Sequence, residues 1–384
     1  MTAPKVSILT HDIGGGTFTN LCTDLVRGFQ ELGVETHLVI LDATEAELAR
    51  FPEIPIVPLK VKRTAFALPA TVRYLQEHQP DVLLPMPWYF NVLAVFARSL
   101  ARVKTKVVLG EHNIISLEAS IEHRDKPHLR FLPLLMRYTY PHADGLVGVS
   151  KDTIGDLVQT LRISANIPMQ VILNPIDVDR VQQQSQAAID HPWFHHSDTP
   201  VIVTAARLAK QKQLDSLLRA FAQVVKKIPA RLLILGEGPL RGELEALSRE
   251  LGMSSAVWMP GYDPNPYRYM AAGDVFVLAS AWEGCPIALQ EAMACGAAVV
   301  VTDAPGGMKD IVEHGKSGVL VKADDPDALA NGILHLLTQP EQKQHYREQA
   351  SQRSQAFHYL SASRQYLDFC QLVLASPSSQ EVSR

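Results

Sequence analysis

The sequence predicts an α/β protein made of two doubly wound, Rossmann-like domains that face a cleft. Short apolar runs of strand length alternate with amphipathic stretches of helix length along most of the chain. The alternation stops over the polar, aperiodic residues 181–199 and then restarts. A length of 384 residues also suits two domains of comparable size. We therefore expect two parallel sheets, each covered by helices on both faces.

The expected domain boundaries follow from that break. The first domain, together with the linker, should cover residues 1–190, and the second should cover residues 191–353. The remaining residues, 354–384, begin with a helical stretch over 354–375 that no strand follows. We expect this helix to pack back on the first domain and residues 376–384 to form a disordered tail.

The first domain opens with a strand, a glycine loop, a helix and a second strand. The first apolar run covers residues 5–10 and the second covers 35–41. Between them an amphipathic helix is expected from Asn20 to Leu32, closed by Gly33. Such a unit forms a right-handed parallel pair. Further buried parallel strands are expected at 82–85, 106–110 and 145–149.

The second domain repeats this alternation. Strands are expected at 201–205, 231–236, 256–259, 274–280 and 298–302, and helices at 213–225 and 240–251. The strand at 274–280 leads into a loop and a helix of small residues that ends at Gly296. In an open α/β sheet, ligands bind where the strands end, so this junction is a candidate site.

Bulk properties exclude several classes of protein. Charged residues make up 20% of the chain and hydrophobic residues 47%, as in ordinary globular enzymes. A net charge of −4 gives no general affinity for polyanions such as nucleic acid. The four cysteines include no C-x-x-C pair, which favours a reduced, cytoplasmic protein without a zinc site. We expect neither a signal peptide nor a bilayer-spanning segment.

Two glutamates eight positions apart lie at the junction after the strand 274–280. Glu283 follows the strand, the turn 284–287 comes next, and Glu291 lies inside the following helix. The glycine of the turn allows a ligand to approach the backbone closely, and the helix start offers unpaired N–H groups. Each carboxylate can accept several hydrogen bonds from hydroxyl groups, which suits a sugar. The alternative is that both are solvated charges at a helix end.

Two further features could bind phosphate. Gly14, Gly15 and Gly16 lie between a strand and a helix, where backbone N–H groups can face phosphate oxygens, although a tight turn needs the same residues. Arg207 and Lys212 follow the first strand of the second domain. They could neutralise a diphosphate leaving group without a metal ion, whereas a basic loop is otherwise ordinary solvated surface.

Three other motifs are less specific. Residues 236–242 resemble a dinucleotide fingerprint with a late third glycine, so we interpret them as a loop beside a nucleotide. Asp177 and Asp179 could suggest a metal-bound sugar nucleotide, but their position at the domain boundary favours a turn. A lone histidine is more often structural, but the strand-end position of His112 favours a functional role.

Taken together, these motifs resemble those of the retaining glycosyltransferases of family 4, which have the GT-B fold. The resemblance covers nearly the whole chain and is strongest from Val201 to Leu337. In the second domain it is carried by Arg207-Leu208-x3-Lys212, Gly236-Glu237-Gly238-Pro239, Gly261-Tyr262, Asp274 to Val277, Glu283 to Gly296 and Gly307 to Val321. In the first domain it is carried by the glycine loop, His112, Ser150 and Asn174-Pro175-x-Asp177.

The resemblance implies a retaining glycosyltransferase that uses no metal and no other cofactor, and whose first domain binds the acceptor. The implied catalytic residues are Glu283, His112, Arg207 and Lys212. The implied donor-binding residues are Gly15, Gly16, Arg207, Lys212, Tyr262, Glu283, Gly284, Cys285, Pro286, Ile287 and Glu291. The donor would be a nucleotide diphosphate-sugar, with UDP preferred as the nucleotide.

Each of these residues has an implied role. Arg207 and Lys212 would hold the donor diphosphate, and the backbone of the glycine loop would close over it. Glu291 would bind the ribose hydroxyls, and Tyr262 lies where the family packs its base. Glu283 and the backbone of 284–287 would hold the donor sugar, which His112 would touch from the first domain. Transfer would proceed by front-side attack through an oxocarbenium-like state, with Glu283 stabilising the sugar cation.

The chain departs from the family pattern at a few positions. Ala206 and Gln213 stand where the family often has glycine, and Thr17 follows the glycine loop where an acidic residue is usual. These differences concern details of the loops and leave the assignment of the family unchanged.

A basic and apolar surface in the first domain suggests a membrane-associated acceptor. Residues 60–106 carry Lys60, Lys62, Arg63, Arg73, Arg98, Arg102, Lys104 and Lys106 against only Glu77 and Asp81. Residues 124–137 add Arg124, Lys126, Arg130 and Arg137 around an apolar run. Such a surface suits docking on an anionic membrane, although solvated helix charges explain it as well.

We therefore expect a cytoplasmic enzyme, peripheral at the inner face of the membrane if this docking occurs. It would transfer a sugar to a glycan, polyprenyl-linked or glycolipid acceptor in the synthesis of bacterial surface polysaccharide or glycolipid. Three alternatives remain. They are a transferase with a small soluble acceptor, a non-hydrolysing UDP-sugar epimerase of GT-B fold, and a carbohydrate-binding subunit without activity.

Overall fold

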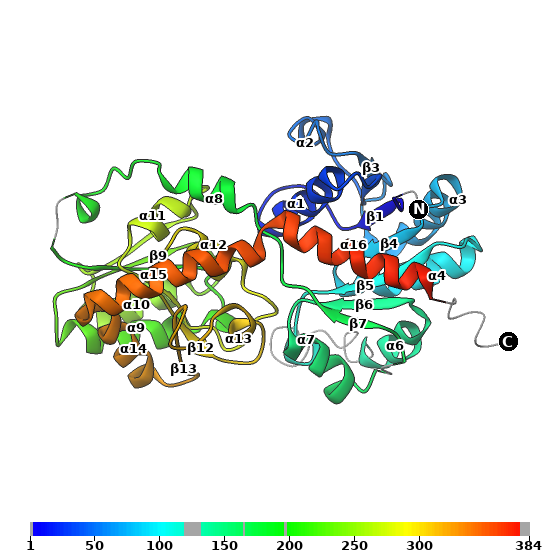
Figure 1. The fold of residues 1–384 in the computed structure, drawn as a ribbon. Helices are drawn as coiled ribbons and strands as arrows, with labels where there is room; N and C mark the ends of the chain where they lie inside the picture. The colour runs from blue at the N-terminus through cyan, green and yellow to red at the C-terminus, as the bar shows by residue number, and fades with distance from the viewer. Residues whose placement is uncertain (1–2, 119–131, 164–165, 196–197, 377–384) are drawn as a thin grey trace. The chain divides into compact units, whose positions relative to one another are not determined.

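The computed structural model describes residues 3–118, 132–163, 166–195 and 198–376. The chain divides into two compact units (Figure 1). The first unit runs to Ile176 and resumes at His358, and the second covers Asp177–Phe357. Each unit holds one sheet and its own hydrophobic core.

Within the described residues, seven parallel strands of the first unit form one sheet in the order β3-β2-β1-β4-β5-β6-β7. These strands are β1 Val6–Leu9, β2 Thr36–Ile40, β3 Ile56–Pro58, β4 Val82–Pro85, β5 Lys106–Glu111, β6 Gly145–Gly148 and β7 Met169–Val171. β1 pairs with both β2 and β4, and all four of its residues are buried. The strand order reverses beside β1, which is where ligands bind in doubly wound sheets.

Helices cover both faces of this sheet. They are α1 Thr17–Glu31, α2 Glu45–Leu48, α3 Ala67–His78, α4 Trp88–Ala101, α5 Ile115–Leu117, α6 Leu132–Thr139, α7 Lys151–Gly155 and α16 Tyr359–Ala375. Short helical turns lie at Thr64–Phe66, Tyr140–His142 and Asp156–Thr160. On one face, α4 packs between α3 and α6 above a shared hydrophobic core.

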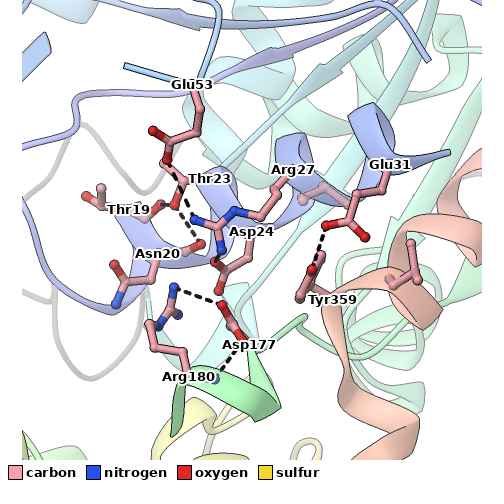
Figure 2. Close-up of polar contacts among 12 residues, drawn as sticks. Thr19, Asn20, Thr23, Asp24, Arg27, Glu31, Glu53, Asp177, Arg180 and Tyr359 are labelled. Atoms are coloured by element: carbon pink, nitrogen blue, oxygen red, sulfur yellow. Dashed lines mark hydrogen bonds and ion pairs between the residues drawn. The ribbon is translucent and has the colours of Figure 1, made fainter. Parts of the chain in front are cut away.

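The C-terminal helix α16 packs against α1 in the first unit. Figure 2 shows the Tyr359 hydroxyl donating to Glu31 at the end of α1, over a distance of 2.7 Å. Gly28 permits this close packing, since a Cβ at that position would lie 2.1 Å from the Ser363 hydroxyl. Arg27 of α1 pairs with Asp24 in its own helix. The helix α16 therefore belongs to the same unit as the N-terminal half of the chain.

The second unit has the same design. In the part of the chain that the structure describes, its six parallel strands follow the order β10-β9-β8-β11-β12-β13. They are β8 Val201–Ala205, β9 Arg231–Leu235, β10 Val257–Gly261, β11 Val275–Leu278, β12 Val299–Asp303 and β13 Val319–Lys322. Its helices are α8 Val178–Ser185, α9 Leu214–Val225, α10 Arg241–Glu250, α11 Tyr267–Ala272, α12 Ile287–Ala294, α13 Met308–Ile311, α14 Pro326–Thr338 and α15 Pro340–Ser354. Three-residue 3-10 turns lie at Pro192–Phe194, Lys210–Lys212 and Gln355–Phe357.

The break in the alternation is not a linker, and the first domain ends earlier than the predicted residue 190. Asp177 begins α8 by accepting a 2.9 Å hydrogen bond from the backbone N–H of Arg180. This helix packs against α11 and α12 and so belongs to the second unit. Its two buried residues, Val178 and Val181, are too few for an apolar pattern to reveal it.

Most predicted strands and helices are present, with ends that move by a few residues. The helix predicted from Asn20 already begins at Thr17, and the one predicted from residue 354 begins at Tyr359. The short strands β3, β7 and β13 were not predicted, and the first two are half-buried throughout. The basic residues Arg124, Lys126 and Arg130 and the predicted tail from residue 377 lie outside the described residues. Of the helices described, none is long and apolar enough to cross a bilayer.

Candidate functional site

An ion pair lies where two neighbouring strands of the second sheet end. Lys212 belongs to the 3-10 turn that follows β8, and Glu283 belongs to the loop that follows β11. The Lys212 ammonium contacts the Glu283 carboxylate, and both side chains are largely buried. Since β8 and β11 are hydrogen-bonded neighbours, their carboxyl ends bring these two loops together. Two of the three predicted catalytic residues of this sheet are therefore in direct contact.

Hydrogen bonds through Gln211 fix the two loops to each other. The Gln211 side-chain amide donates to the carbonyl oxygen of Trp282 at 2.9 Å, and the Gln211 carbonyl accepts from the N–H of Ala281 at 2.8 Å. This holds the backbone just before Lys212 and the backbone just before Glu283 at a fixed separation. The geometry of the ion pair is thus held by the backbone as well as by charge.

The Glu283 carboxylate is held by a second donor besides Lys212. The Ser280 hydroxyl donates to it at 2.6 Å, and the Ser280 carbonyl in turn accepts from the Thr302 hydroxyl at 2.6 Å. Only 6% of Glu283 is exposed. A buried carboxylate with an ammonium and a hydroxyl beside it is oriented, because it has few alternative positions that satisfy its oxygens.

Glycines after β12 allow the Glu283 loop to lie in place. Gly306 has a φ of +125°, and a Cβ there would lie 1.6 Å from the Glu283 carbonyl oxygen. The neighbouring Gly307 donates to the Gly284 carbonyl at 2.9 Å. Glu283 itself donates from its backbone to Pro305 at 3.0 Å. No side chain fits between these backbones, so glycine is required at position 306.

Arg207 is exposed beside the ion pair's loop and is positioned by a second pair of glycines. A Cβ at Gly236, where φ is +125°, would lie 2.0 Å from the Ala206 carbonyl oxygen. A Cβ at Gly238 would lie 2.4 Å from the Leu208 carbonyl oxygen. The loop predicted to lie beside a nucleotide thus packs its backbone directly against residues 206–208. Its glycines serve this packing, and they hold Arg207 at the sheet edge.

The α12 junction places the remaining predicted donor residues. Cys285 is buried, and Pro286 precedes the first helical residue, Ile287. Glu291 accepts a 2.8 Å hydrogen bond from the Tyr267 hydroxyl of α11. Burial, followed by the nearby Glu291 carboxylate, raises the pKa of Tyr267, which therefore stays a hydrogen-bond donor. Glu291 is half-buried.

Tyr262 lies apart from this packed network. It follows β10 directly and is 72% exposed. Gly261 before it has a φ of +100°, and a Cβ there would lie 2.4 Å from a carboxylate oxygen of Glu237. The backbone that carries Tyr262 is thus fixed by Gly261, and the tyrosine ring is exposed to solvent.

The glycine loop of the first unit turns sharply into α1. Gly15 and Gly16 have φ values of +122° and +90°, and Gly16 caps the helix without any side-chain bond. Asp12 accepts from the N–H of Gly14 at 3.0 Å, and Thr19 exchanges hydrogen bonds with the backbone of Gly15. The loop therefore has the helix-start geometry that was predicted, and part of its N–H capacity is used within the loop.

His112 ends β5 as a buried, neutral side chain. Only 7% of it is exposed, and its Nδ1 lies 3.1 Å from the side-chain oxygen of Asn174. Its Nε2 is buried and has no hydrogen-bond partner among the described residues. Burial lowers the pKa of His112 to about 4, and the Asn174 bond opposes that shift. Because Nδ1 donates to the Asn174 oxygen, the Nε2 of the neutral imidazole can accept a hydrogen bond from a hydroxyl group.

The preceding residue, Glu111, is a buried acid. The Tyr140 hydroxyl donates to it at 2.7 Å, and the Asn91 side chain lies at 3.3 Å and also donates to the Gly110 carbonyl. Its other oxygen, Oε1, accepts no hydrogen bond from the part of the chain that the structure describes. Burial raises the pKa of Glu111 to about 8. This network fixes the end of β5 and therefore the backbone of His112.

Several residues of the site were missed by sequence reasoning. Ser280, Gln211 and Tyr267 each bond to a predicted residue or its loop, but a serine, a glutamine and a tyrosine carry no motif of their own. Gly306 had a signal, since it forms a glycine pair after a predicted strand. No three His, Cys, Asp or Glu side chains gather as a metal site within the ranges described.

Family models match both halves of the chain. Residues 18–180 match the model described as Glycosyltransferase Family 4, and residues 185–353 match the one described as Glycosyl transferases group 1. The matched regions together contain every predicted site residue outside the glycine loop.

A full-length relative is known in Campylobacter jejuni. It is named N-acetylgalactosamine-N,N'-diacetylbacillosaminyl-diphospho-undecaprenol 4-alpha-N-acetylgalactosaminyltransferase. It is 28% identical to this chain, and the match covers 95% of this chain and 99% of the relative.

Solved structures share the two-domain architecture. Anabaena HepE in complex with UDP superposes with a TM-score of 0.78 at 21% identity, over 96% of this chain and 100% of that one. Sucrose-phosphate synthase from Thermosynechococcus elongatus has a TM-score of 0.79 at 18% identity, over 97% of this chain and 100% of that one. These likenesses establish the fold, two parallel-sheet Rossmann-like domains.

Proposed function

This chain belongs to glycosyltransferase family 4, and we propose that it moves a sugar from a UDP-sugar to a lipid-linked glycan with retention of anomeric configuration. The observation that carries the proposal is the Lys212–Glu283 pair at the end of β8 and β11, with Arg207 on the same loop. Cations and a fixed carboxylate are the groups that a donor diphosphate and a sugar cation require.

The cations act on the leaving group. When the bond from the sugar carbon to the diphosphate oxygen breaks, negative charge grows on the diphosphate. Arg207 offers a planar fork of donors and Lys212 a compact ammonium, so together they stabilise that charge more in the transition state than in the bound donor. In this role they replace a divalent metal ion, and we propose a reaction that needs no metal.

The carboxylate acts on the sugar. Glu283 is held by Lys212 and Ser280, so its negative charge has a fixed direction when positive charge develops at the sugar carbon. Glu291, which accepts a hydrogen bond from the Tyr267 hydroxyl, would bind the ribose hydroxyls with its carboxylate. The exposed ring of Tyr262 would pack on the base.

A lipid-linked acceptor is supported by the Campylobacter relative, whose name specifies a diphospho-undecaprenol glycan and a galactosamine-type sugar. The match to that protein extends over the acceptor-binding half as well as the donor half. We therefore place the reaction in the synthesis of a bacterial surface polysaccharide or glycolipid. Such an acceptor would put the enzyme at the cytoplasmic face of the membrane.

The experiment is a donor screen in EDTA. Purified full-length protein is mixed with UDP-GalNAc, UDP-GlcNAc, UDP-Glc, UDP-Gal, GDP-Man or ADP-Glc, and release of the nucleotide diphosphate is measured with and without a polyprenyl-diphosphate glycan. We expect one UDP-sugar to be turned over. Lys212→Ala should lower kcat by about 100-fold or more, as the loss of a transition-state donor does.

Lys210→Ala is the matched control, because Lys210 lies in the same turn and is exposed. It should leave turnover unchanged. Equal losses in both variants would mean that the turn's fold, and not the Lys212 charge, was measured. Turnover that requires a divalent metal, or a product of inverted configuration by NMR, would overturn the mechanism. Transfer only to small soluble sugars would refute the proposed lipid-linked acceptor.

A further inference from the structure

The outer surface of the helical layer in the first unit is apolar where solvent reaches it. Two exposed side chains of α4 and three of α6 form this surface, which we call the α4–α6 face. Its members are Phe96 at 45% exposure, Leu100 at 59%, Leu134 at 50%, Leu135 at 41% and Tyr138 at 70%. Because α4 and α6 pack against each other, these side chains share one side of the layer.

Helical spacing extends the face along α4. Phe96 and Leu100 are four residues apart, and half-buried Leu93 lies one turn before Phe96. Leu134 and Tyr138 have the same four-residue spacing on α6. Both spacings put side chains on one line of a helix. Within the described residues, α4 is therefore apolar on its outward side as well as on its core side, and exposed apolar faces of this kind mark interaction sites.

Exposed basic residues lie on α3 and α6, which both pack against α4, and on the segments beside α3 and α4. They are Arg63 before the 3-10 turn Thr64–Phe66, Arg73 in α3, Arg102 and Lys104 after α4, and Arg137 in α6, whose Nε donates to the Leu161 carbonyl; all five are exposed. Arg98 and Lys106 differ, because they are buried in ion pairs with Asp144. The whole chain has a net charge of −4, so this excess of positive charge is local.

We infer that the α4–α6 face docks on the surface of an anionic phospholipid bilayer. Phe and Leu side chains enter the boundary between headgroups and acyl chains, and Tyr keeps its hydroxyl in the headgroup layer. The neighbouring arginines and lysines then meet the phosphates. A second copy of this chain is a poorer occupant, because a two-fold contact would place the basic residues of one copy against those of the other. The inference deepens the proposed function, since a lipid-linked acceptor lies in such a layer.

The test is sedimentation of the full-length protein with vesicles. Vesicles of phosphatidylcholine alone are compared with vesicles that also contain phosphatidylglycerol. We expect binding to the anionic vesicles only, with a decrease when salt is raised from roughly 50 mM to 500 mM. A Phe96→Ser, Leu100→Ser double variant should bind about tenfold more weakly or worse, because it removes two inserted side chains.

Leu372→Ser is the matched control, because Leu372 is a 52% exposed leucine of the same unit that lies on α16. It should bind as the unaltered protein does. Equal thermal midpoints for the three proteins would exclude unfolding as the cause. Binding that is absent, indifferent to lipid charge, or lost equally in Leu372→Ser would overturn the inference. So would a dimer in solution that the double variant dissociates.

The outcome can be separated from that of the proposed function. Vesicle binding needs no donor, and donor turnover in solution needs no vesicle. The double variant should therefore keep its turnover of the UDP-sugar in the absence of lipid while losing its vesicle binding. A protein that binds vesicles but turns over no donor would refute the proposed function and leave the docking surface standing.

Discussion

The two sheets end in opposite kinds of polar groups. At the carboxyl edge of the second sheet, Lys212 and Glu283 form a charged pair that hydroxyls and backbone hold in place. At the same edge of the first sheet, Glu111 and His112 are buried side chains that stay uncharged near neutral pH, with pKa values of about 8 and about 4. Two sheets of the same architecture therefore differ in the charge at their carboxyl edges.

The difference follows from the groups that offset the desolvation cost of the buried side chains at each edge. In the second sheet, the Lys212 ammonium and the Glu283 carboxylate are in contact, so each offsets part of the cost of burying the other. In the first sheet, Tyr140 and Asn91 donate neutral hydrogen bonds to Glu111, and His112 bonds to the side-chain oxygen of Asn174. These bonds are too weak to offset desolvation of a charge. The charged edge suits a diphosphate, and the neutral edge suits hydroxyl groups.

The largest expected effect is on the backbone packing that supports the charged edge. Gly306→Ala should destabilise the protein by about 3 kcal/mol or more, because its Cβ would collide with the Glu283 carbonyl in a left-handed conformation. UDP-sugar turnover should be lost with it. Urea unfolding followed by circular dichroism measures the first effect, and donor turnover measures the second.

Gly315→Ala is the control for backbone strain. Gly315 also has a positive φ, of +75°, but a Cβ there would meet nothing within 4 Å. It should cost only about 1–2 kcal/mol. Equal losses in the two variants would show that the close approach to Glu283 contributes nothing.

The charged edge could be predicted from the sequence better than the neutral one. Arg207, Lys212, Glu283 and Glu291 lie in short motifs that follow predicted strands, and parallel strands bring such ends together. The pairing of His112 with Asn174 could not be predicted, because 62 residues separate them and the intervening chain decides whether they meet. The α8 helix was missed because its contacts are with α11 and α12, far along the chain.

The next effect concerns the pH dependence of stability that Glu111 creates. Its pKa is raised from 4.5 to about 8 on folding, so the folded state keeps a proton that the unfolded state loses. The stability contributed by this group is complete below pH 4.5 and is lost as pH rises to about 8, at about 1.4 kcal/mol per pH unit. The free energy of unfolding, measured with urea at several pH values, should therefore depend less on pH between 6.5 and 8 in Glu111→Gln than in the unaltered protein. An unchanged slope there would refute the buried-acid assignment.

His112 should act with the opposite sign. Its pKa falls from 6.5 to about 4 on folding. The stability that this group contributes is therefore fully present above pH 6.5 and is lost as the pH falls toward 4. Between pH 4.5 and 6.5, Glu111 makes the free energy of unfolding fall with rising pH and His112 makes it rise. The two contributions cancel in the unaltered protein, so neither is visible there. His112→Gln should therefore reveal a stability that falls with rising pH from 4.5 to 6.5. The same urea series detects it, and a flat curve would contradict the neutral-edge picture.

The smallest expected effect lies at Glu291. Tyr267→Phe removes the 2.8 Å hydrogen bond to this carboxylate but keeps the ring in place. We expect a loss of about 0.5–1.5 kcal/mol in stability. Thermal unfolding with and without UDP measures it, and Tyr269→Phe on the same helix is the control, because its hydroxyl contacts Arg268 instead. A larger loss in the control would reject a special role for the Glu291 contact.

The return of the chain to its first unit has a consequence for the order in which the protein can be completed. Residues 177–357 interrupt the first unit, and α16 arrives only after them. During synthesis from the N-terminus, the second unit has every residue it needs once Phe357 has been made. The first unit, begun earlier, still lacks the helix that covers Gly28 and Gly145. The unit of the protein that is started first is thus the last to receive all of its helices.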